Sequence, residues 1–415
     1  MGSNSEIIEV EIKRSNLVAE LSSPVLESLP RDLILCILSR LPVSSFVQLR
    51  SVCTGWCMLA RDPDLVNKYR SCMDEINNPC LIFHSDCTIK NQLHFVEFPD
   101  CNHESKEKAK RFHVPFWEVM PEFDVLGSYN GLLCLSDSLQ NDALCVCNPF
   151  TGNYQDLPKS TLFLNQQVVY GFGFHPTTKE YKVLKIVYYM NSNKDYLRAL
   201  RVYVELDSEV QIFTLGSSTW RSLGKVGYLH HLYQWHSQVL VNGRLHWVTW
   251  PRRYHHGIKI ISFDLAEEQF LEVPSTPLMG FNYHLVVLGG CLFAAVYFNY
   301  CKLEIWVMAE YGVEESWIKK FDIRAHMPKG LKEDPANQFF KNSKIIWKGG
   351  YIRVLCLLKN GDILLEYKNR ALVSYGPKSG EFKDVIFQGM PKWYQTIVHV
   401  GSLTWIDTTL ISTGA

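Results

Sequence analysis

The stretch SLPRDLILCILSRLPVSSFVQLRSVCTGWCMLA, from Ser28 to Ala60, decides how the first part of the chain folds. Its first apolar residues repeat at steps of three and four, the spacing of one face of an α-helix: Leu33, Ile34, Ile37, Leu38 and Leu41. Ser28 is expected to cap this helix, Pro30 to lie in its first turn and Pro42 to end it. Two more short helices are expected between Pro42 and Ala60.

This stretch holds more apolar side chains than its own size can cover. About forty residues cannot bury so many among themselves, so part of the apolar surface is expected to face another polypeptide. The sequence therefore predicts a docking module. The alternative is an ordinary helical hairpin that packs on the rest of the chain.

The string LPRDLILCILSRLP, followed by Leu49, Arg50, Val52, Cys53 and Trp56, resembles an F-box. Members of that family bind a Skp-type adaptor and through it join the cullin and RING subunits of a ubiquitin ligase. The resemblance implies these adaptor-facing residues: Leu29, Pro30, Asp32, Leu33, Ile37, Leu38, Leu41, Pro42 and Val43. It also implies three residues that partly close the module's own core and partly reach the adaptor: Val52, Cys53 and Trp56. Gly55 departs from the family pattern, at a cost of about 1 kcal/mol of helix propensity.

The charge balance and the cysteine content indicate which partners and which compartment to expect. The 42 Lys and Arg balance 42 Asp and Glu, so no net charge favours nucleic acid or an anionic membrane. The 13 Cys are odd in number and lack framework spacing, which indicates reduced thiols in a cytoplasmic and nuclear protein. No export signal and no run of 18 apolar residues is found.

A repeat organises the rest of the chain. Five segments share an apolar strand, a short polar turn, an aromatic residue and an aliphatic residue three positions later. The aromatic residues are Tyr154, Trp220, Phe270, Trp317 and Phe382, at spacings of 66, 50, 47 and 65 residues. These spacings are close to one blade of a β-propeller, and each segment is expected to be a hairpin whose second strand starts at the aromatic residue.

A second hairpin precedes each of these segments and often turns at glycine, as at Asn130-Gly131, Asn242-Gly243, Gly289-Gly290 and Asn360-Gly361. Each unit is therefore expected to have four antiparallel strands. Two strands in residues 80–99 and two in 396–406 would combine into a sixth blade closed by both ends of the domain. Six blades are expected, and five or seven remain open.

This half resembles the F-box-associated domain of plant F-box proteins, which is similar to kelch-type propellers. The strings that carry the resemblance include NPFTGNYQDLP, NGRLHWVTW and ISFDLAEEQFLEVP. We therefore expect a disordered N-terminus over residues 1–23, a small all-α F-box with a connecting helix over 24–78, an all-β propeller over 79–408 and a tail over 409–415.

Loop lengths indicate where a substrate would bind. Most long connections are expected on the face that carries the links between the second and third strands and between blades, and long loops gathered on a rigid scaffold are usually functional. The residues richest in interface-prone types on that face are Tyr228, His231, Tyr233, Trp235, Trp250, Arg252, Arg253 and Tyr254. The alternative is that half of these side chains fill gaps between blades.

No sequence pattern indicates an enzyme, a cofactor or a metal site. The pairs His230-His231 and His255-His256 lack the i,i+4 spacing that places two ligands on one side, and no phosphate-binding glycine motif occurs. The leading hypothesis is a non-catalytic substrate-recognition subunit of a Skp–cullin–F-box ubiquitin ligase with an unknown protein substrate. The alternatives are an adaptor-bound scaffold that degrades nothing, and a propeller enzyme such as a sugar oxidase or lyase with ligands in its central channel.

Overall fold

The computed structural model describes residues 29–43, 45, 48, 52, 54–59, 62, 64–66, 68–69, 80–85, 92–97, 108–112, 120, 122–137, 143–162, 166–189, 207–226, 238–249, 259–276, 282–298, 302–324, 326, 328–332 and 352–401. The predicted N-terminal and C-terminal tails lie outside these residues. Among the described residues, no helix is long and apolar enough to cross a membrane.

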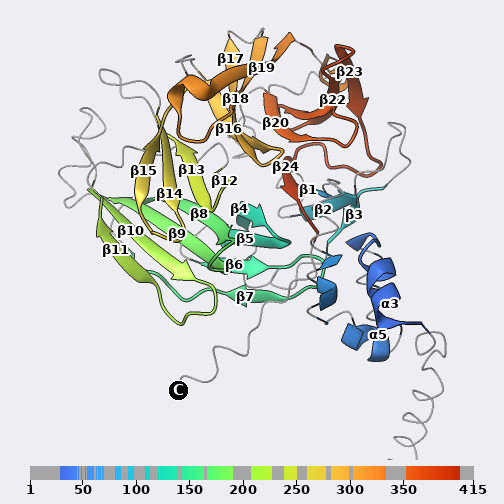
Figure 1. Cartoon of the computed structure of the whole chain (residues 1–415), viewed down its shortest axis with the longest axis vertical. Helices are drawn as coiled ribbons and strands as arrows, with labels where there is room; N and C mark the ends of the chain where they lie inside the picture. The colour runs from blue at the N-terminus through green and yellow to red at the C-terminus, as the bar shows by residue number, and fades with distance from the viewer. Residues whose placement is uncertain are drawn as a thin grey trace, which may run out of the picture.

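The described part of the chain forms a short helical region beside a ring of six four-stranded antiparallel sheets (Figure 1). The described helices of the N-terminal region include α3 (Arg31–Leu38) and α5 (Thr54–Leu59). Both lie at the rim of the ring, next to the blades that hold β1 and β6 (Figure 1). The predicted fold class, a small helical module followed by a six-bladed propeller, is confirmed.

Five blades are each built from four consecutive strands, with the first strand innermost. Blade one contains β4 (Phe123–Tyr129), β5 (Leu132–Asp137), β6 (Leu144–Cys147) and β7 (Tyr154–Asp156). Blade two contains β8 (Gln167–His175), β9 (Glu180–Tyr189), β10 (Asp207–Thr214) and β11 (Arg221–Lys225). Blade three contains β12 (Val239–Val241), β13 (Arg244–Val248), β14 (Ile260–Asp264) and β15 (Phe270–Val273).

Blade four contains β16 (Asn282–Leu288), β17 (Cys291–Phe298), β18 (Lys302–Met308) and β19 (Trp317–Arg324). Blade five contains β20 (Ile352–Leu357), β21 (Ile363–Tyr367), β22 (Ala371–Gly376) and β23 (Glu381–Val385). Two short helical turns lie in the connections, η1 (Glu314–Ser316) and α8 (Lys329–Lys332). Each predicted aromatic marker lies at or within one residue of the start of an outermost strand.

Blade six closes the ring with strands from both ends of the domain. Its order is β24 (Gln395–His399), β1 (Cys80–Ser85), β2 (Gln92–Glu97) and β3 (Lys110–Arg111), with β24 innermost. One strand therefore comes from the C-terminal side and three from the N-terminal side, so the expected division of two and two is wrong. The fourth strand, β3, is two charged exposed residues that pair with β2 and carry no apolar signal of their own.

The predicted glycine turns connect the first and second strands of their blades. Asn130 and Gly131 have φ of 45° and 81°, and Asn242 and Gly243 have 51° and 71°. Two successive positive φ values define the tight turn whose twist matches paired strands. At the fourth predicted turn only Gly361 has positive φ, because the chain makes a longer turn there, closed by the Leu358 N–H on the Asp362 carbonyl.

The helical region and the propeller share one hydrophobic core. Ile34, Leu35, Leu38 and Val43 pack with Leu65 and Tyr69 and with residues of blades six and one, among them Ile82, Phe95, Phe123, Leu133 and Phe150. A helical segment follows the F-box helices, because Asp62 Oδ1 accepts the Asp64 N–H at 2.9 Å and residues 64–66 are helical. The helical module is therefore fixed against the seam between blades six and one.

Candidate adaptor-binding and substrate-binding surfaces

Helix α3 has two apolar faces, and the chain buries only one of them. Ile34, Leu35 and Leu38 are buried in the core shared with the propeller. Leu33 and Ile37 are spaced four residues apart on the other face, and their side chains remain 52% and 56% exposed. A helix with one face in its own core and an apolar stripe on the other is suited to bind a second polypeptide.

The ends of α3 are set by local hydrogen bonds. Pro30 is the N-cap, and its carbonyl accepts the N–H groups of Leu33 and Ile34 at 3.0 and 3.2 Å. At the other end the Ser39 hydroxyl donates to the Cys36 carbonyl at 3.1 Å. The predicted cap Ser28 lies outside the described residues. These contacts fix where the exposed stripe begins and ends.

Arg31 links the start of α3 to the helical segment that begins after Asp62. Its guanidinium donates to the Asp62 and Asp64 carboxylates, the latter at 3.2 Å. Because the Arg31 side chain is mostly exposed, this ion pair orients the two helices more than it stabilises the fold.

The exposed apolar residues concentrate in the helical region. Of the eleven large apolar side chains that the described residues expose, five lie there: Leu29, Leu33, Ile37, Val52 and Met58. Met58, on α5, is 74% exposed and was missed in the sequence, because a single methionine outside the helical repeat carries no pattern. It adds a flexible apolar side chain of the kind common on binding surfaces.

Two predicted adaptor-facing residues have a different role in the free chain. Leu38 and Val43 are only 3% and 4% exposed and lie in the chain's own core, so their expected outward orientation is corrected. Leu41 and Trp56 are half-buried and pack against the same core. Pro30, Asp32 and Pro42 are exposed, and Cys53 lies outside the described residues. The adaptor-binding role itself stays a prediction.

The junction between helices and propeller excludes water. Burial raises the pKa of the Tyr69 hydroxyl above its ordinary value, and the nearby Glu97 carboxylate adds to this. The pKa of the Cys80 thiol is raised for the same two reasons. Both groups therefore stay neutral, and the junction holds the module by apolar packing.

The helical region sits at a defined end of the blade strands. Cys80 starts β1 opposite Glu97 and His399, which end β2 and β24. Gly401 lies beside Val43, so the helices contact this end of blade six. In a propeller the first and third turns of the blades share one end of the strands, and in blade six that end is the one at Cys80. The second and fourth connections therefore leave from the opposite end.

Most of the long connections belong to that opposite end, and residues 98–109 are an exception because they join β2 to β3 on the helical side. Two links at the opposite end, over residues 299–301 and 368–370, are only three residues long. All eight predicted substrate-binding residues lie outside the described residues: Tyr228, His231, Tyr233, Trp235, Trp250, Arg252, Arg253 and Tyr254. Their role stays a prediction.

Within the described residues, no group of three or more His, Cys, Asp or Glu side chains is placed to hold a metal ion. The adjacent histidine pairs lie outside those residues. Cys145 and Cys147 are buried in the same core cluster, on one face of β6, and burial raises the pKa of both thiols. Both are therefore protonated packing groups.

Comparison with known proteins gives two family matches. Residues 26–68 match the F-box domain, and residues 80–405 match the F-box associated beta propeller domain. The chain is 49% identical over 401 residues to the F-box protein At3g07870 of Arabidopsis thaliana, covering 93% of this chain and 94% of that protein. It is 27% identical to the F-box protein CPR1 of Arabidopsis thaliana, covering 91% and 88%.

Among solved structures, TolB from Acinetobacter baumannii aligns with a TM-score of 0.41 and 9% identity, covering 78% of this chain and 66% of that one. This likeness is too weak to bear on function. The two domain matches follow the division seen in the structure, where a helical region precedes a closed ring of six blades. The chain belongs to the F-box proteins that carry an F-box associated β-propeller domain.

Proposed function

We propose that this chain is the substrate-recognition subunit of a Skp–cullin–F-box ubiquitin ligase. The helical region binds the Skp-type adaptor, and the propeller binds a protein substrate so that it is ubiquitinated and degraded by the proteasome. F-box proteins are in general non-catalytic substrate adaptors, and this chain contributes to the reaction by proximity alone. Its site of action is the cytoplasm and nucleus.

One observation carries the proposal: α3 keeps an apolar stripe after the chain has formed its core. Leu33 and Ile37 are more than half exposed although Leu35 and Leu38, on the same helix, are buried. Covering the exposed half of each side chain would gain about 1–1.5 kcal/mol. Leaving such a stripe in water on an otherwise well-packed helix favours a partner that covers it.

The position of the helices also suits a receptor. They contact the end of the blade strands that carries the short turns, whereas most long connections leave from the other end. An adaptor on the helices would leave that other end free. The proposed substrate face there includes the loop residues predicted from the sequence.

The test replaces the two exposed apolar residues of α3 and leaves its buried residues unchanged. The double variant Leu33→Asp/Ile37→Asp is expected to lose co-purification with a Skp-type adaptor by at least about 100-fold, because two carboxylates would have to be buried at the interface. Leu38→Asp is unsuitable, since Leu38 is buried in the chain's own core. Unchanged adaptor binding by the double variant would remove the proposed mechanism.

Matched controls are available on the propeller. Leu271 on β15 and Ile318 on β19 are also large, exposed and apolar, at 46% and 55%. The variant Leu271→Asp/Ile318→Asp carries the same charge change and is expected to bind the adaptor normally. Stabilisation of interacting proteins when the cullin is inhibited supports a degradation receptor; adaptor binding without such stabilisation indicates a scaffold.

A further inference from the structure

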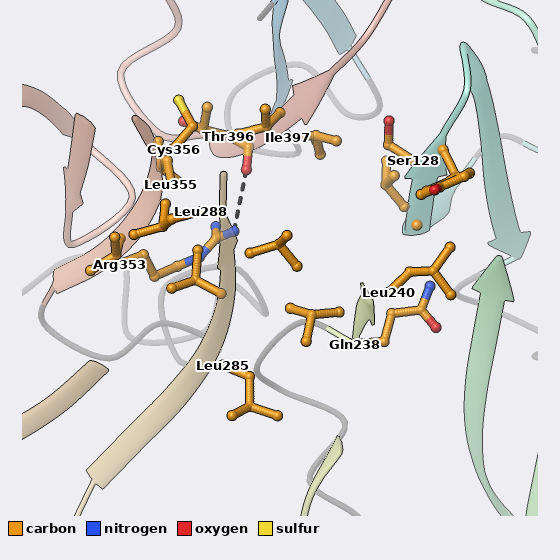
Figure 2. Close-up of a pocket in the computed structure, with 18 of the residues that line it drawn as sticks. Ser128, Gln238, Leu240, Leu285, Leu288, Arg353, Leu355, Cys356, Thr396 and Ile397 are labelled. Carbon is orange, nitrogen blue, oxygen red and sulfur yellow. Dashed lines mark hydrogen bonds between the residues drawn. The ribbon is translucent and has the colours of Figure 1, made fainter. Parts of the chain in front are cut away.

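The innermost strands of all six blades surround a central cavity of about 930 Å³ (Figure 2). Its wall combines polar side chains with aliphatic ones from β12, β16, β20 and β24, among them Leu240, Val287, Leu355 and Ile397. Leu240, Val287 and Ile397 are only half-buried, because part of each side chain faces the cavity. This volume is at the upper end of the range, about 300–1,000 Å³, of pockets that hold small molecules.

Two polar side chains on this wall, Gln238 and Ser128, already hydrogen-bond within the protein. Gln238 uses both ends of its amide on the backbone of Phe172, with its oxygen accepting the N–H at 2.8 Å and its nitrogen donating to the carbonyl at 2.9 Å. The Ser128 hydroxyl bonds His399 Nδ1 at 2.9 Å. These groups tie neighbouring blades together and leave little for a ligand to bind.

Arg353 is different, because it keeps unused donors at the cavity. One guanidinium nitrogen donates to Glu366 at 3.0 Å and the other to the Thr396 carbonyl at 3.3 Å. A guanidinium has five N–H donors, so three remain. The side chain is 18% exposed, and Figure 2 shows its guanidinium beside Thr396, with the open part of the cavity between it and Leu240 and Gln238.

The charge on Arg353 is already balanced. Glu366 is fully buried, and its second oxygen accepts the Thr396 N–H at 2.7 Å. A ligand that brought a further negative charge to Arg353 would add a charge that its ion pair with Glu366 does not need, at a desolvation cost. A neutral oxygen can accept a hydrogen bond from Arg353 without that cost.

We propose that the central cavity binds an uncharged, largely apolar small molecule whose carbonyl or hydroxyl oxygen accepts a hydrogen bond from Arg353. A polypeptide segment is a poorer occupant, because each of its residues brings an N–H and a C=O that need partners, which Gln238 and Ser128 do not supply. The proposal is independent of adaptor binding.

The test uses the full chain and two neutral fluorescent probes. Prodan carries a ketone, whereas N-phenyl-1-naphthylamine has no oxygen acceptor. Prodan is expected to bind saturably with a blue-shifted emission. Val287→Trp and Ile397→Trp fill the cavity from β16 and β24 and are expected to weaken prodan binding at least tenfold.

The variant Arg353→Lys tests the contribution of the hydrogen bond separately from that of the cavity volume. It keeps a positive charge beside Glu366 but loses the planar fork of donors. Prodan binding is expected to weaken three- to tenfold, while binding of N-phenyl-1-naphthylamine changes less than twofold. This arm still decides the proposal if both tryptophan variants fail to fold.

The apolar stripe on α3 is the obvious competing site for a fluorescent probe, so Leu33→Asp/Ile37→Asp serves as the control and is expected to bind prodan normally. Three results would overturn the proposal: no saturable binding by the unsubstituted chain, unchanged binding by folded tryptophan variants, or equal effects of Arg353→Lys on both probes.

Discussion

His246 shows how a single buried residue makes the fold sensitive to acid. It is fully buried on β13, with Nε2 at 2.7 Å from the Tyr311 hydroxyl and Nδ1 at 3.4 Å from the Val239 carbonyl. A neutral ring satisfies both contacts, since Nδ1–H donates to the carbonyl and Nε2 accepts from Tyr311. Burial is the main reason why the pKa of His246 is lowered to about 4, and the Arg244 charge adds to it.

The free energy of unfolding is therefore expected to fall as the pH drops from 6.5 towards 4. In that window the unfolded chain, with a histidine pKa of about 6.5, binds a proton that the folded chain refuses. His246 alone would account for about 1–2 kcal/mol between pH 7 and pH 5. His399, whose pKa burial lowers to about 3, acts in the same direction.

Urea unfolding at pH 7 and pH 5 measures this dependence. His246→Gln removes one of the two groups and should lower stability at pH 7 while making its pH dependence shallower. An identical loss of stability between the two pH values in the variant and the unsubstituted chain would show that His246 titrates normally when folded.

At the scale of elements, two tryptophans join neighbouring blades by the same contact. Trp220, just before β11, donates its Nε1–H to the carbonyl of Pro158 at 2.7 Å, and Trp317 at the start of β19 donates to Pro274 at 3.0 Å. Both prolines follow the outermost strand of the preceding blade. The two tryptophans of the aromatic repeat therefore mark blade seams as well as strand starts.

Trp220→Phe and Trp317→Phe are each expected to lower the free energy of unfolding by about 1–3 kcal/mol, because a proline carbonyl loses its donor. Trp306→Phe is the matched control. Its Nε1 donates to Glu304 on the same strand, and that carboxylate keeps Lys302 and Lys319 as partners. Chemical denaturation of the three variants should show a smaller loss for Trp306→Phe; equal losses would contradict a role at the seams.

A helix, strand or turn is predicted well from the sequence when its own residues show a local pattern. The aromatic markers predicted five outer hairpins, and Asn130 and Asn242 predicted two tight turns. The short strand β3 escaped prediction because Lys110 and Arg111 form a strand only by pairing with β2. In the same way, periodicity showed that α3 is apolar but could not show that Leu38 would pack on the propeller, since that depends on which surface the fold brings to it.

At the scale of the whole molecule, the helical region and the propeller are expected to unfold together. Leu65 and Tyr69 are almost fully buried between them, in the same cluster as residues of blades six and one. A shared core of this kind makes the two parts one cooperative unit. It also means that an adaptor bound to α3 is held in a fixed position relative to the propeller.

The contact between Gly401 and Val43 tests this unity. A Cβ atom on residue 401 would lie 2.8 Å from Val43 Cγ1, and Val43 is a stiff, buried side chain that cannot rotate away. Gly401→Ala is therefore expected to lower the thermal unfolding midpoint of the whole chain and to cost about 1–3 kcal/mol. Gly376→Ala is the control, because its new Cβ would meet the Ser379 hydroxyl at 2.7 Å and the Asp362 carboxylate at 3.3 Å, the ends of two side chains that can shift.

The double variant Gly401→Ala/Val43→Ala restores space at the junction. It should therefore be more stable than the sum of the two single changes predicts, by about 0.5–3 kcal/mol. Calorimetry of the four chains of this cycle measures the coupling. If the helical region were an independent unit, Gly401→Ala would leave the midpoint of the propeller unchanged, the two substitutions would be additive, and calorimetry would resolve two transitions.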